Sequence, residues 1–205
     1  MYSLSVILAL TTIVAGTIAD FTTGPSLLRI TGKTNSSLNG YAEACHAGAA
    51  NEGLCYVEQA PKDYDFYHFY YNYTIDGNGI KKGIIIYMLD YNGSPNSGHL
   101  DSAVRLEPEL GSNLNLAFIP AGVERPTIFS VGDDGKFYIS GLRDDRASNE
   151  TQPEFGGNRD LANFHLCWQW VEFYWLYSIA WATTLPPQNP SCQPVDLELV
   201  GPHDQ

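Results

Sequence analysis

The stretch from Tyr64 to Tyr91, YDFYHFYYNYTIDGNGIKKGIIIYMLDY, contains two runs of strand-forming residues separated by a strong turn signal. Aromatic and β-branched residues dominate Tyr64–Ile75, and the Asp-Gly-Asn-Gly segment at Asp76–Gly79 is typical of a tight hairpin, because Gly and Asn tolerate positive φ angles. Gly83–Tyr91 is almost continuously apolar, which predicts a central strand covered on both faces. The stretch therefore predicts an antiparallel hairpin in a β-rich fold.

Outside this hairpin, turn-forming residues recur at short intervals, and the segments between them favour strands. The strands expected there are Ser26–Thr31, Asn115–Ile119, Thr127–Val131 and Phe137–Leu142. The main loops expected are Lys33–Gly40, Asn92–Gly98 and Arg143–Asp160.

The segment Asn163–Thr183 contains no Gly or Pro and allows two interpretations. A helix is suggested by the spacing of Trp168, Val171, Trp175 and Ile179. Most of the segment nevertheless consists of aromatic and β-branched residues, which favour strands. We therefore expect two strands with a turn near Glu172–Tyr174.

These elements predict an all-β fold, mainly antiparallel and either sandwich-like or barrel-like. One short helix is expected near the first pair of cysteines, over the alanine-rich segment Ala42–Asn51. The chain shows no internal repeat, linker or block of charge, so residues 20–205 are expected to form a single domain.

Residues 1–19 are predicted to be a secretory signal peptide. They contain no charged side chain, Val6–Leu10 forms a short apolar core, and Thr17 and Ala19 are the small residues that signal peptidase requires. Cleavage after Ala19 would leave Asp20 as the first residue. No later stretch is long and apolar enough to span a bilayer, so a protein without a membrane span is expected.

Glycosylation is a second indication of secretion. Four Asn-x-Ser/Thr sequons without an intervening proline are present. Their asparagines are Asn35, Asn72, Asn92 and Asn149. We therefore expect a glycoprotein that is extracellular or associated with a cell wall.

The four cysteines are an even number, as expected where oxidation pairs thiols. Four cysteines allow three pairings, and proximity in the sequence favours Cys45–Cys55 and Cys167–Cys192. No Cys-x-x-Cys spacing suggests a metal site, so the cysteines are interpreted as structural disulfides.

The formal net charge of −12 bears on the partners. An acidic chain repels phosphate backbones and anionic membranes, and its few basic residues form no cluster beyond Lys81-Lys82. Nucleic acid is therefore not expected as a partner. The expected partner is a wall polysaccharide or an extracellular protein.

Two groups of motifs carry a resemblance to a known family. The first contains LNGY at 38–41, HAGA at 46–49 and Leu54-Cys55. The second contains Cys167, YSIAW at 177–181, PQNPSC at 187–192 and Val195-Asp196. Over most of the chain, the sequence resembles a family of small secreted proteins of filamentous fungi whose function is not known. The resemblance implies a fungal secreted protein with a β-sandwich or barrel-like core, and it assigns no catalytic or binding residue.

No catalytic, cofactor-binding or metal site is expected. The five histidines follow no metal-binding spacing, and no Gly-x-Ser-x-Gly motif occurs. Carboxylates for a glycoside hydrolase are available, but two of them must be held close together, which sequence spacing does not decide. The candidates are Asp90, Asp101, Glu107, Glu109, Glu124 and Glu172.

The aromatic run before the hairpin suggests a ligand-binding face. Alternate residues of a strand share one face, and a glycan on Asn72 would require that face to reach solvent. The residues expected on it are Tyr64, Phe66, His68 and Tyr70. Such a row could stack on sugar rings or dock a protein. The alternative is that both faces of the strand are core.

Taken together, these features predict a secreted, non-enzymatic glycoprotein that acts at the fungal cell wall or at the interface with a host or competitor. It would bind carbohydrate or protein there. A secreted hydrolase with a carboxylate pair is one alternative, and a carrier for a small apolar ligand is another.

Overall fold

The computed structural model describes residues 21–59, 65–93, 96–140 and 160–201. The predicted signal peptide at 1–19, Tyr64, Asn149 and almost all of the expected loop Arg143–Asp160 lie outside these ranges. The described ranges contain one 3-10 helix, η1 (Asp65–Tyr67), and thirteen strands. The strands are β1 (Phe21–Gly32), β2 (Asn39–Gly48), β3 (Asn51–Val57), β4 (Phe69–Ile75), β5 (Lys81–Gly93), β6 (Asn96–Ala103), β7 (Arg105–Pro108), β8 (Leu114–Pro120), β9 (Phe129–Val131), β10 (Phe137–Tyr138), β11 (Phe164–Val171), β12 (Tyr174–Ala182) and β13 (Gln193–Val200).

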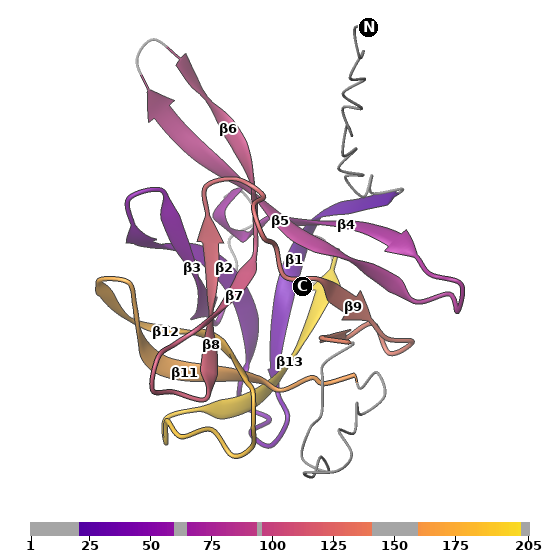
Figure 1. Ribbon diagram of the computed structural model, residues 1–205, viewed down its shortest axis with the longest axis vertical. Helices are drawn as coiled ribbons and strands as arrows, with labels where there is room; N and C mark the ends of the chain where they lie inside the picture. The colour runs from indigo at the N-terminus through magenta and orange to yellow at the C-terminus, as the bar shows by residue number, and fades with distance from the viewer. Residues whose placement is uncertain (1–20, 60–64, 94–95, 141–159, 202–205) are drawn as a thin grey trace, which may run out of the picture.

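Six of the strands pair in a closed antiparallel ring. Their order is β1, β2, β3, β12, β11 and β13, and β13 pairs back to β1. β3 and β12 meet at Cys55 and Ser178, and β8 strengthens this seam by pairing with both strands. β7 lies on the outer side of β8. The prediction of an all-β, mainly antiparallel fold that is sandwich-like or barrel-like is therefore confirmed, and the closed ring is the barrel-like part. β11, β12 and β13 lie in the lower part of Figure 1.

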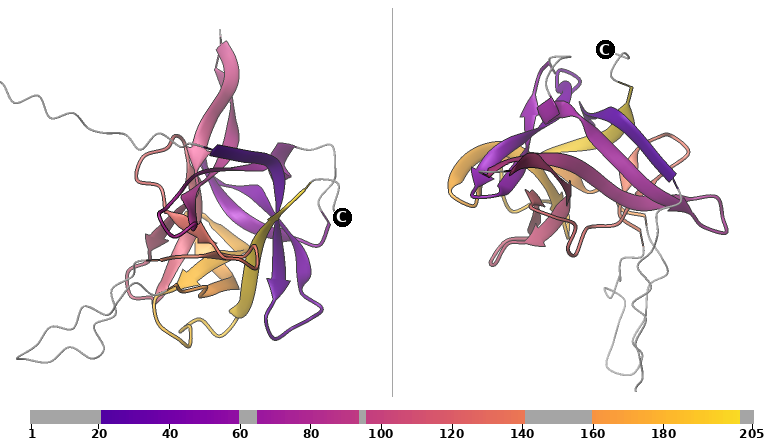
Figure 2. Two further views of the ribbon diagram at one scale, coloured as in Figure 1. Left: turned by 90° about the vertical axis from the view of Figure 1, so that its right-hand side faces the viewer. Right: turned by 90° about the horizontal axis from the view of Figure 1, so that it is seen from above.

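A second antiparallel sheet shares β1 with the ring. Its order is β1, β4, β5, β9 and β10, and β6 pairs with the far half of β5. The first half of β1 pairs with β4, and the second half, from Leu27, pairs with β13. The pairing of β1 with β4 contains a register shift between Thr23 and Ser26, where Gly24 has a φ of 138° and its missing Cβ would lie 2.7 Å from the Phe69 carbonyl oxygen. The β5–β6 hairpin projects from this sheet (Figures 1 and 2).

The hydrophobic core fills the ring and continues to the second sheet as one cluster. Inside the ring, Ile30, Leu166 and Leu197 are at most 1% exposed. Phe69 and Phe129 of the second sheet are equally buried and belong to the same cluster. Because one core joins both sheets, the described residues form a continuous packed unit.

Two disulfides are present, and they join the predicted pairs. Cys45–Cys55 links β2 to β3, and Cys167–Cys192 links β11 to the segment that precedes β13. The second bond closes the longer loop, with a sequence separation of 25 against 10.

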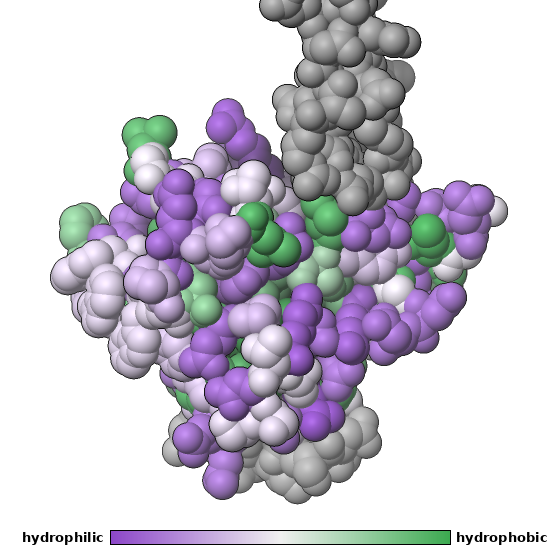
Figure 3. Space-filling model, turned by 90° about the horizontal axis from the view of Figure 1, so that it is seen from below, coloured by the Kyte–Doolittle hydropathy of each residue, from purple (hydrophilic) through white to green (hydrophobic). Residues whose placement is uncertain are grey.

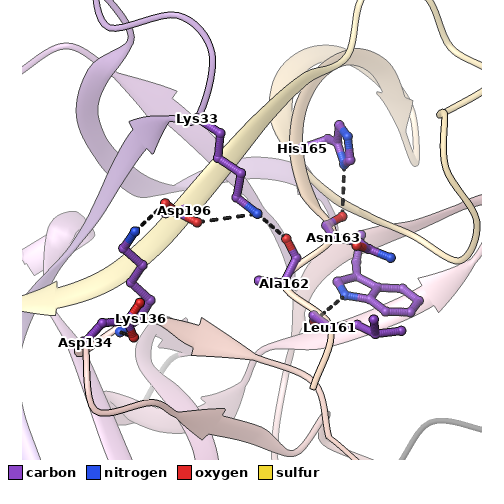
Figure 4. Close-up of polar contacts among 9 residues, drawn as sticks. Lys33, Asp134, Lys136, Leu161, Ala162, Asn163, His165 and Asp196 are labelled. Carbon is purple, nitrogen blue, oxygen red and sulfur yellow. Dashed lines mark hydrogen bonds and ion pairs between the residues drawn. The ribbon is translucent and has the colours of Figure 1, made fainter. Parts of the chain in front are cut away.

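A polar cluster fixes β13 against three other segments (Figure 4). The Asp196 carboxylate accepts a hydrogen bond from Lys136 Nζ at 2.7 Å and forms an ion pair with Lys33 Nζ at 3.4 Å. Lys33 Nζ also donates to the Ala162 carbonyl. Nearby, buried His165 contacts the Asn163 carbonyl through Nδ1 at 2.9 Å. Burial lowers the pKa of His165, which favours the neutral imidazole.

The predicted helix over Ala42–Asn51 was wrong, because this segment contains the end of β2, a turn and the start of β3. Ala42 and Ala44 are buried on one face of β2, and Tyr41 and Glu43 alternate with them. Small side chains suit that face because it turns toward the crowded ring interior. Tertiary packing therefore overrides the helix propensity of alanine here.

Other boundaries also differ from the expectation. The expected strand Phe137–Leu142 is strand only at Phe137–Tyr138, and Leu142 lies outside the described residues. The aromatic strand begins at Phe69 instead of Tyr64, and Asp65–Tyr67 forms η1. The expected loop Asn92–Gly98 is mostly strand, since β5 runs to Gly93 and β6 begins at Asn96.

Other sequence predictions hold. β5 is central and pairs with three strands. Asn163–Thr183 forms two strands joined at Glu172-Phe173. No helix in the described ranges is long and apolar enough to cross a membrane.

Candidate ligand-binding site

Four aromatic side chains share one face of the β11–β12 hairpin. In the antiparallel register, Trp168 lies opposite Tyr177, and Trp170 lies opposite Trp175. The same face carries Phe164 and Leu166 closer to the ring, because alternate residues of a strand point the same way. We call Trp168, Trp170, Trp175 and Tyr177 the aromatic row.

Each ring of the aromatic row contacts its spatial neighbour in the row. The Trp168 ring lies 5.0 Å from Tyr177 and 6.5 Å from Trp175, with planes within 22° in both pairs. Trp170 meets Trp175 edge to face at 5.6 Å, and Tyr56 of β3 extends the row beyond Tyr177. Such contacts hold the rings in place before any ligand arrives.

The aromatic row is exposed because the hairpin extends beyond the ring. β11 pairs with β13 at His165 and Leu166, and the hairpin continues past this point toward its turn. Consequently Phe164 and Leu166 are buried, whereas Trp168 is 46% and Trp170 is 61% exposed. Trp175 is 52% exposed. Side chains of intermediate hydropathy, drawn pale, gather over this end of the molecule (Figure 3).

A cleft of about 540 Å³ lies beside the aromatic row. Its volume falls within the range of about 300–1,000 Å³ that is typical of ligand sites. The hairpin, β8, the segment that joins β7 to β8 and the segment before β13 form its walls. The lining residues are Glu107, Pro108, Glu109, Ser112, Leu114, Leu116, Phe118, Trp168, Gln169, Trp170, Glu172, Trp175 and Asn189.

The charged groups that line the cleft are acidic. Glu107, Glu109 and Glu172 contribute three carboxylates, and no Lys, Arg or His appears among the described lining residues. Arg105, which adjoins the cleft through β7, forms an ion pair with Glu107. Glu109 and Glu172 are both exposed to solvent. The cleft therefore has a negative potential that favours a cation.

Gln169 is a buried polar residue in the wall of this cleft. It is 5% exposed, and its Nε2 donates to Ser178 Oγ at 2.9 Å and to the backbone carbonyls of Ser178 and Ile179. These two carbonyls fix the orientation of the Gln169 amide. If the amide were flipped, Oε1 would face two other acceptors and could not donate a hydrogen bond to them. Oε1 has no hydrogen-bond partner among the described residues. It is an acceptor without a partner among those residues, and, because alternate residues of a strand point to opposite sides, the Gln169 side chain lies on the face opposite the aromatic row.

At Trp168, the side chains of Ser191 and Asn189 occupy the free edge of β11. The backbone N–H of Trp168 donates to Ser191 Oγ at 3.0 Å, and the Trp168 carbonyl accepts from Asn189 Nδ2 at 2.8 Å. The Cys167–Cys192 disulfide ties the same segment to β11. An added peptide strand would have to displace these bonds, so the edge is unsuited to β-strand addition at this point.

Tyr177 provides a neutral hydroxyl next to the exposed tryptophans. Gln193 Nε2 donates to the Tyr177 oxygen at 3.2 Å. Burial raises the pKa of Tyr177, so the phenol keeps its proton over the physiological range.

The ligand face predicted from sequence is not a single strand face. Phe66 is half-exposed but belongs to η1, and His68 precedes the start of β4. Tyr70 is half-buried on β4, next to the core residues Phe69 and Tyr71. Tyr64 lies outside the described residues. The structure thus does not bring these four residues together in one row.

The sequons are placed as follows. Asn35 and Asn72 are half-exposed; Asn35 Oδ1 accepts a hydrogen bond from Ser37 Oγ, and Asn72 Oδ1 accepts one from Thr22 Oγ1. The backbone of Asn92 belongs to β5, and Asn149 lies outside the described residues. Glycosylation of these asparagines stays a prediction.

The structure separates the carboxylates that were considered for hydrolysis. Three of the six, Glu107, Glu109 and Glu172, line the cleft. Asp90 forms an ion pair with His99 on the β5–β6 hairpin. No group of three or more His, Cys, Asp or Glu in the described ranges is arranged to hold a metal ion.

A second hollow of about 190 Å³ lies at the second sheet, where Tyr71, Tyr73 and Phe137 are among its lining residues. It is smaller than a typical site for a drug-sized ligand. This hollow therefore gives little support to the hypothesis that the protein carries a small apolar ligand.

The aromatic row was not expected as a site from the sequence, although the sequence contains a signal for it. Trp168 and Trp170 alternate on one side of the expected turn, and Trp175 and Tyr177 alternate on the other. A two-residue turn places all four on one face. The sequence did not indicate that the residues on this face are buried up to Leu166 and exposed beyond it.

No protein-family model matches the chain, and no curated protein or solved structure was found to match it. The resemblance to secreted fungal proteins therefore remains an expectation from the sequence.

Proposed function

We propose that this chain is a secreted, non-enzymatic glycoprotein that binds polysaccharide at the fungal cell wall or at the interface with a host or competitor. The observation that carries the proposal is the aromatic row beside the cleft. Soluble proteins seldom leave several large aromatic side chains adjacent and exposed unless a partner covers them.

The aromatic row suits sugar rings. The apolar C–H faces of a pyranose pack on aromatic rings, and its hydroxyls need hydrogen-bonding groups nearby. The cleft offers such groups in Ser112, Gln169 and Asn189. Because the rings already support one another, little side-chain entropy would be lost on binding.

Retention on insoluble chitin and β-1,3-glucan tests this proposal. Wild-type protein should bind at least one polymer, and Trp168→Ala and Trp175→Ala should each weaken that binding about tenfold. Tyr91→Ala is the matched control, because Tyr91 is exposed to a similar degree (47%) but lies on β5. Tyr70→Ala tests the face predicted from sequence in the same assay. Wild-type protein that binds neither polymer would contradict the proposal.

A hydrolase is the second candidate, favoured by the three glutamates in the cleft. Glycoside hydrolysis needs a pair of carboxylates, one of which acts as an acid. Release of reducing ends from the bound polymer, lost in Glu107→Gln, Glu109→Gln or Glu172→Gln, would support catalysis. Binding without release would support the non-enzymatic function.

A further inference from the structure

We propose that the cleft recognises a cationic amino-sugar polymer, such as chitosan, through its glutamates and the aromatic row together. This inference rests on the proposed function and names its ligand class. Two separate observations support it: the sign of the charges that line the cleft, and the unpartnered acceptor on Gln169.

The first observation is electrostatic. The lining carboxylates of Glu107, Glu109 and Glu172 are opposed by one neighbouring cation, Arg105, which is already paired with Glu107. A neutral polymer could donate hydroxyl hydrogen bonds to these carboxylates but would form no charge pair with them. An ammonium group would gain from the carboxylates and also from the tryptophan faces, since indole attracts cations more strongly than other aromatic rings do.

The second observation concerns hydrogen bonding. Gln169 Oε1 is buried in the cleft wall without a donor among the described residues, which is an unfavourable arrangement until a water molecule or a ligand group donates to it. Amino sugars carry O–H and N–H donors and can supply the missing bond. The neighbouring glutamates are acceptors as well, so the polar lining of this part of the cleft favours a ligand rich in donors.

A basic protein would also offer cations, but the geometry favours a sugar polymer. The edge of β11 is closed at Trp168 by Asn189 and Ser191, so an extended peptide could not pair there without breaking those bonds. The exposed side chains of Trp168, Trp170 and Trp175 instead offer an apolar surface to a polymer of rings.

The test compares binding to chitosan and to fully acetylated chitin in a mildly acidic buffer in which the chitosan amine is protonated. We expect chitosan to bind more tightly and to be released by salt, because screening weakens charge pairing. The triple variant Glu107→Gln, Glu109→Gln, Glu172→Gln should lose about tenfold in chitosan affinity, with chitin binding nearly unchanged. Asp101→Asn is the matched charge control, because Asp101 is exposed on β6, which lies away from the β11–β12 hairpin (Figure 1).

The outcomes separate this inference from the proposed function. Equal binding of chitosan and chitin, or a triple variant that binds chitosan like wild type, would overturn the inference and leave polysaccharide binding intact. Tighter, glutamate-dependent binding of polylysine than of chitosan would also overturn it, in favour of a basic protein partner. Glutamate-dependent chitosan binding that Trp168→Ala leaves unchanged would also overturn the inference, because the inference assigns recognition to the glutamates and the aromatic row together. A thermal melt of each variant ensures that only folded protein is compared.

Discussion

Trp168 and Tyr177 lie opposite each other across the β11–β12 hairpin, with ring centroids 5.0 Å apart and planes 22° apart, and Trp168 is still 46% exposed. A contact of this kind orders an aromatic surface without removing it from solvent.

Trp168→Ala should weaken polysaccharide binding but lower the free energy of unfolding by only about 1 kcal/mol, because its ring is half-exposed. Trp181, on the same strand face as Tyr177 but 5% exposed, belongs to the core. Trp181→Ala should therefore lower stability by about 3–5 kcal/mol through the cavity it leaves. Denaturant unfolding measures both values. Equal losses would mean that the aromatic row is structural.

Glu172→Gly should stabilise the fold and weaken chitosan binding in one step. Glu172 occupies the two-residue turn of the hairpin with a φ of 53°, a conformation that glycine adopts freely and other residues disfavour. Relief of this strain should raise the free energy of unfolding by about 1 kcal/mol. Glu172→Gln is the control, because it removes the charge but keeps the strain. A destabilised glycine variant would contradict this account of the turn.

Removal of the Cys167–Cys192 disulfide should cost more stability than removal of Cys45–Cys55. The sequence separations are 25 and 10 residues. Loop-closure entropy then gives about 3.5 kcal/mol and about 2.7 kcal/mol, respectively. Paired Cys→Ala variants and denaturant unfolding check the order. Because Cys192 lies next to Ser191, loss of this disulfide should also weaken binding at the cleft, whereas loss of Cys45–Cys55 should not.

His165 should make the fold sensitive to mild acid. Its imidazole is 4% exposed, and burial lowers its pKa below the value of about 6.5 expected in the unfolded chain. The unfolded state therefore takes up the proton more readily. The stabilisation from neutral His165 is complete above about pH 6.5 and is lost as pH falls through the lower pKa of the folded state.

The variant His165→Asn tests this, since its amide nitrogen can still donate to the Asn163 carbonyl. The free energy of unfolding of the wild type, measured from pH 8 to pH 5, should fall more steeply than that of the variant. Parallel curves would show that other groups, such as carboxylates, account for all of the acid sensitivity.

Intact mass tests the secretory prediction. The secreted protein should begin at Asp20 and carry glycans on at least two of Asn35, Asn72, Asn92 and Asn149. Glycosidase treatment should then lower its mass. A retained Met1, or a mass that does not change, would contradict the prediction.

Local chemistry made part of this fold predictable. The Asp76–Gly79 turn and the apolar run from Gly83 identified the β4–β5 hairpin, and the aromatic content of Asn163–Thr183 identified β11 and β12. The ring was not predictable, because it depends on pairings between strands that are distant in sequence. The alanines of β2 were misread because their burial depends on neighbours that local propensity does not include.

The candidate site was less predictable than the fold. Its tryptophans were visible in the sequence, but their exposure follows from the point at which β13 stops pairing with β11. Glu107 and Glu109 reach the same cleft through the β7–β8 segment, some sixty residues before the hairpin in the chain. Only the three-dimensional arrangement joins those parts.

Closure of the ring by β1 and β13 bears on the order in which the protein is made. Of the ring strands, the ribosome releases β1 first and β13 last, and Leu27 can meet its partner Val200 only after the other five ring strands have been synthesised. Until then, the edges of β1 and β11 that pair with β13 remain unpaired, and the apolar side chains that line the ring are not enclosed. Until β13 has been synthesised, these open edges and apolar faces are therefore prone to aggregation. A premature stop before Gln193 would leave that vulnerable state permanent, whereas the same number of residues lost from a loop outside the ring would not.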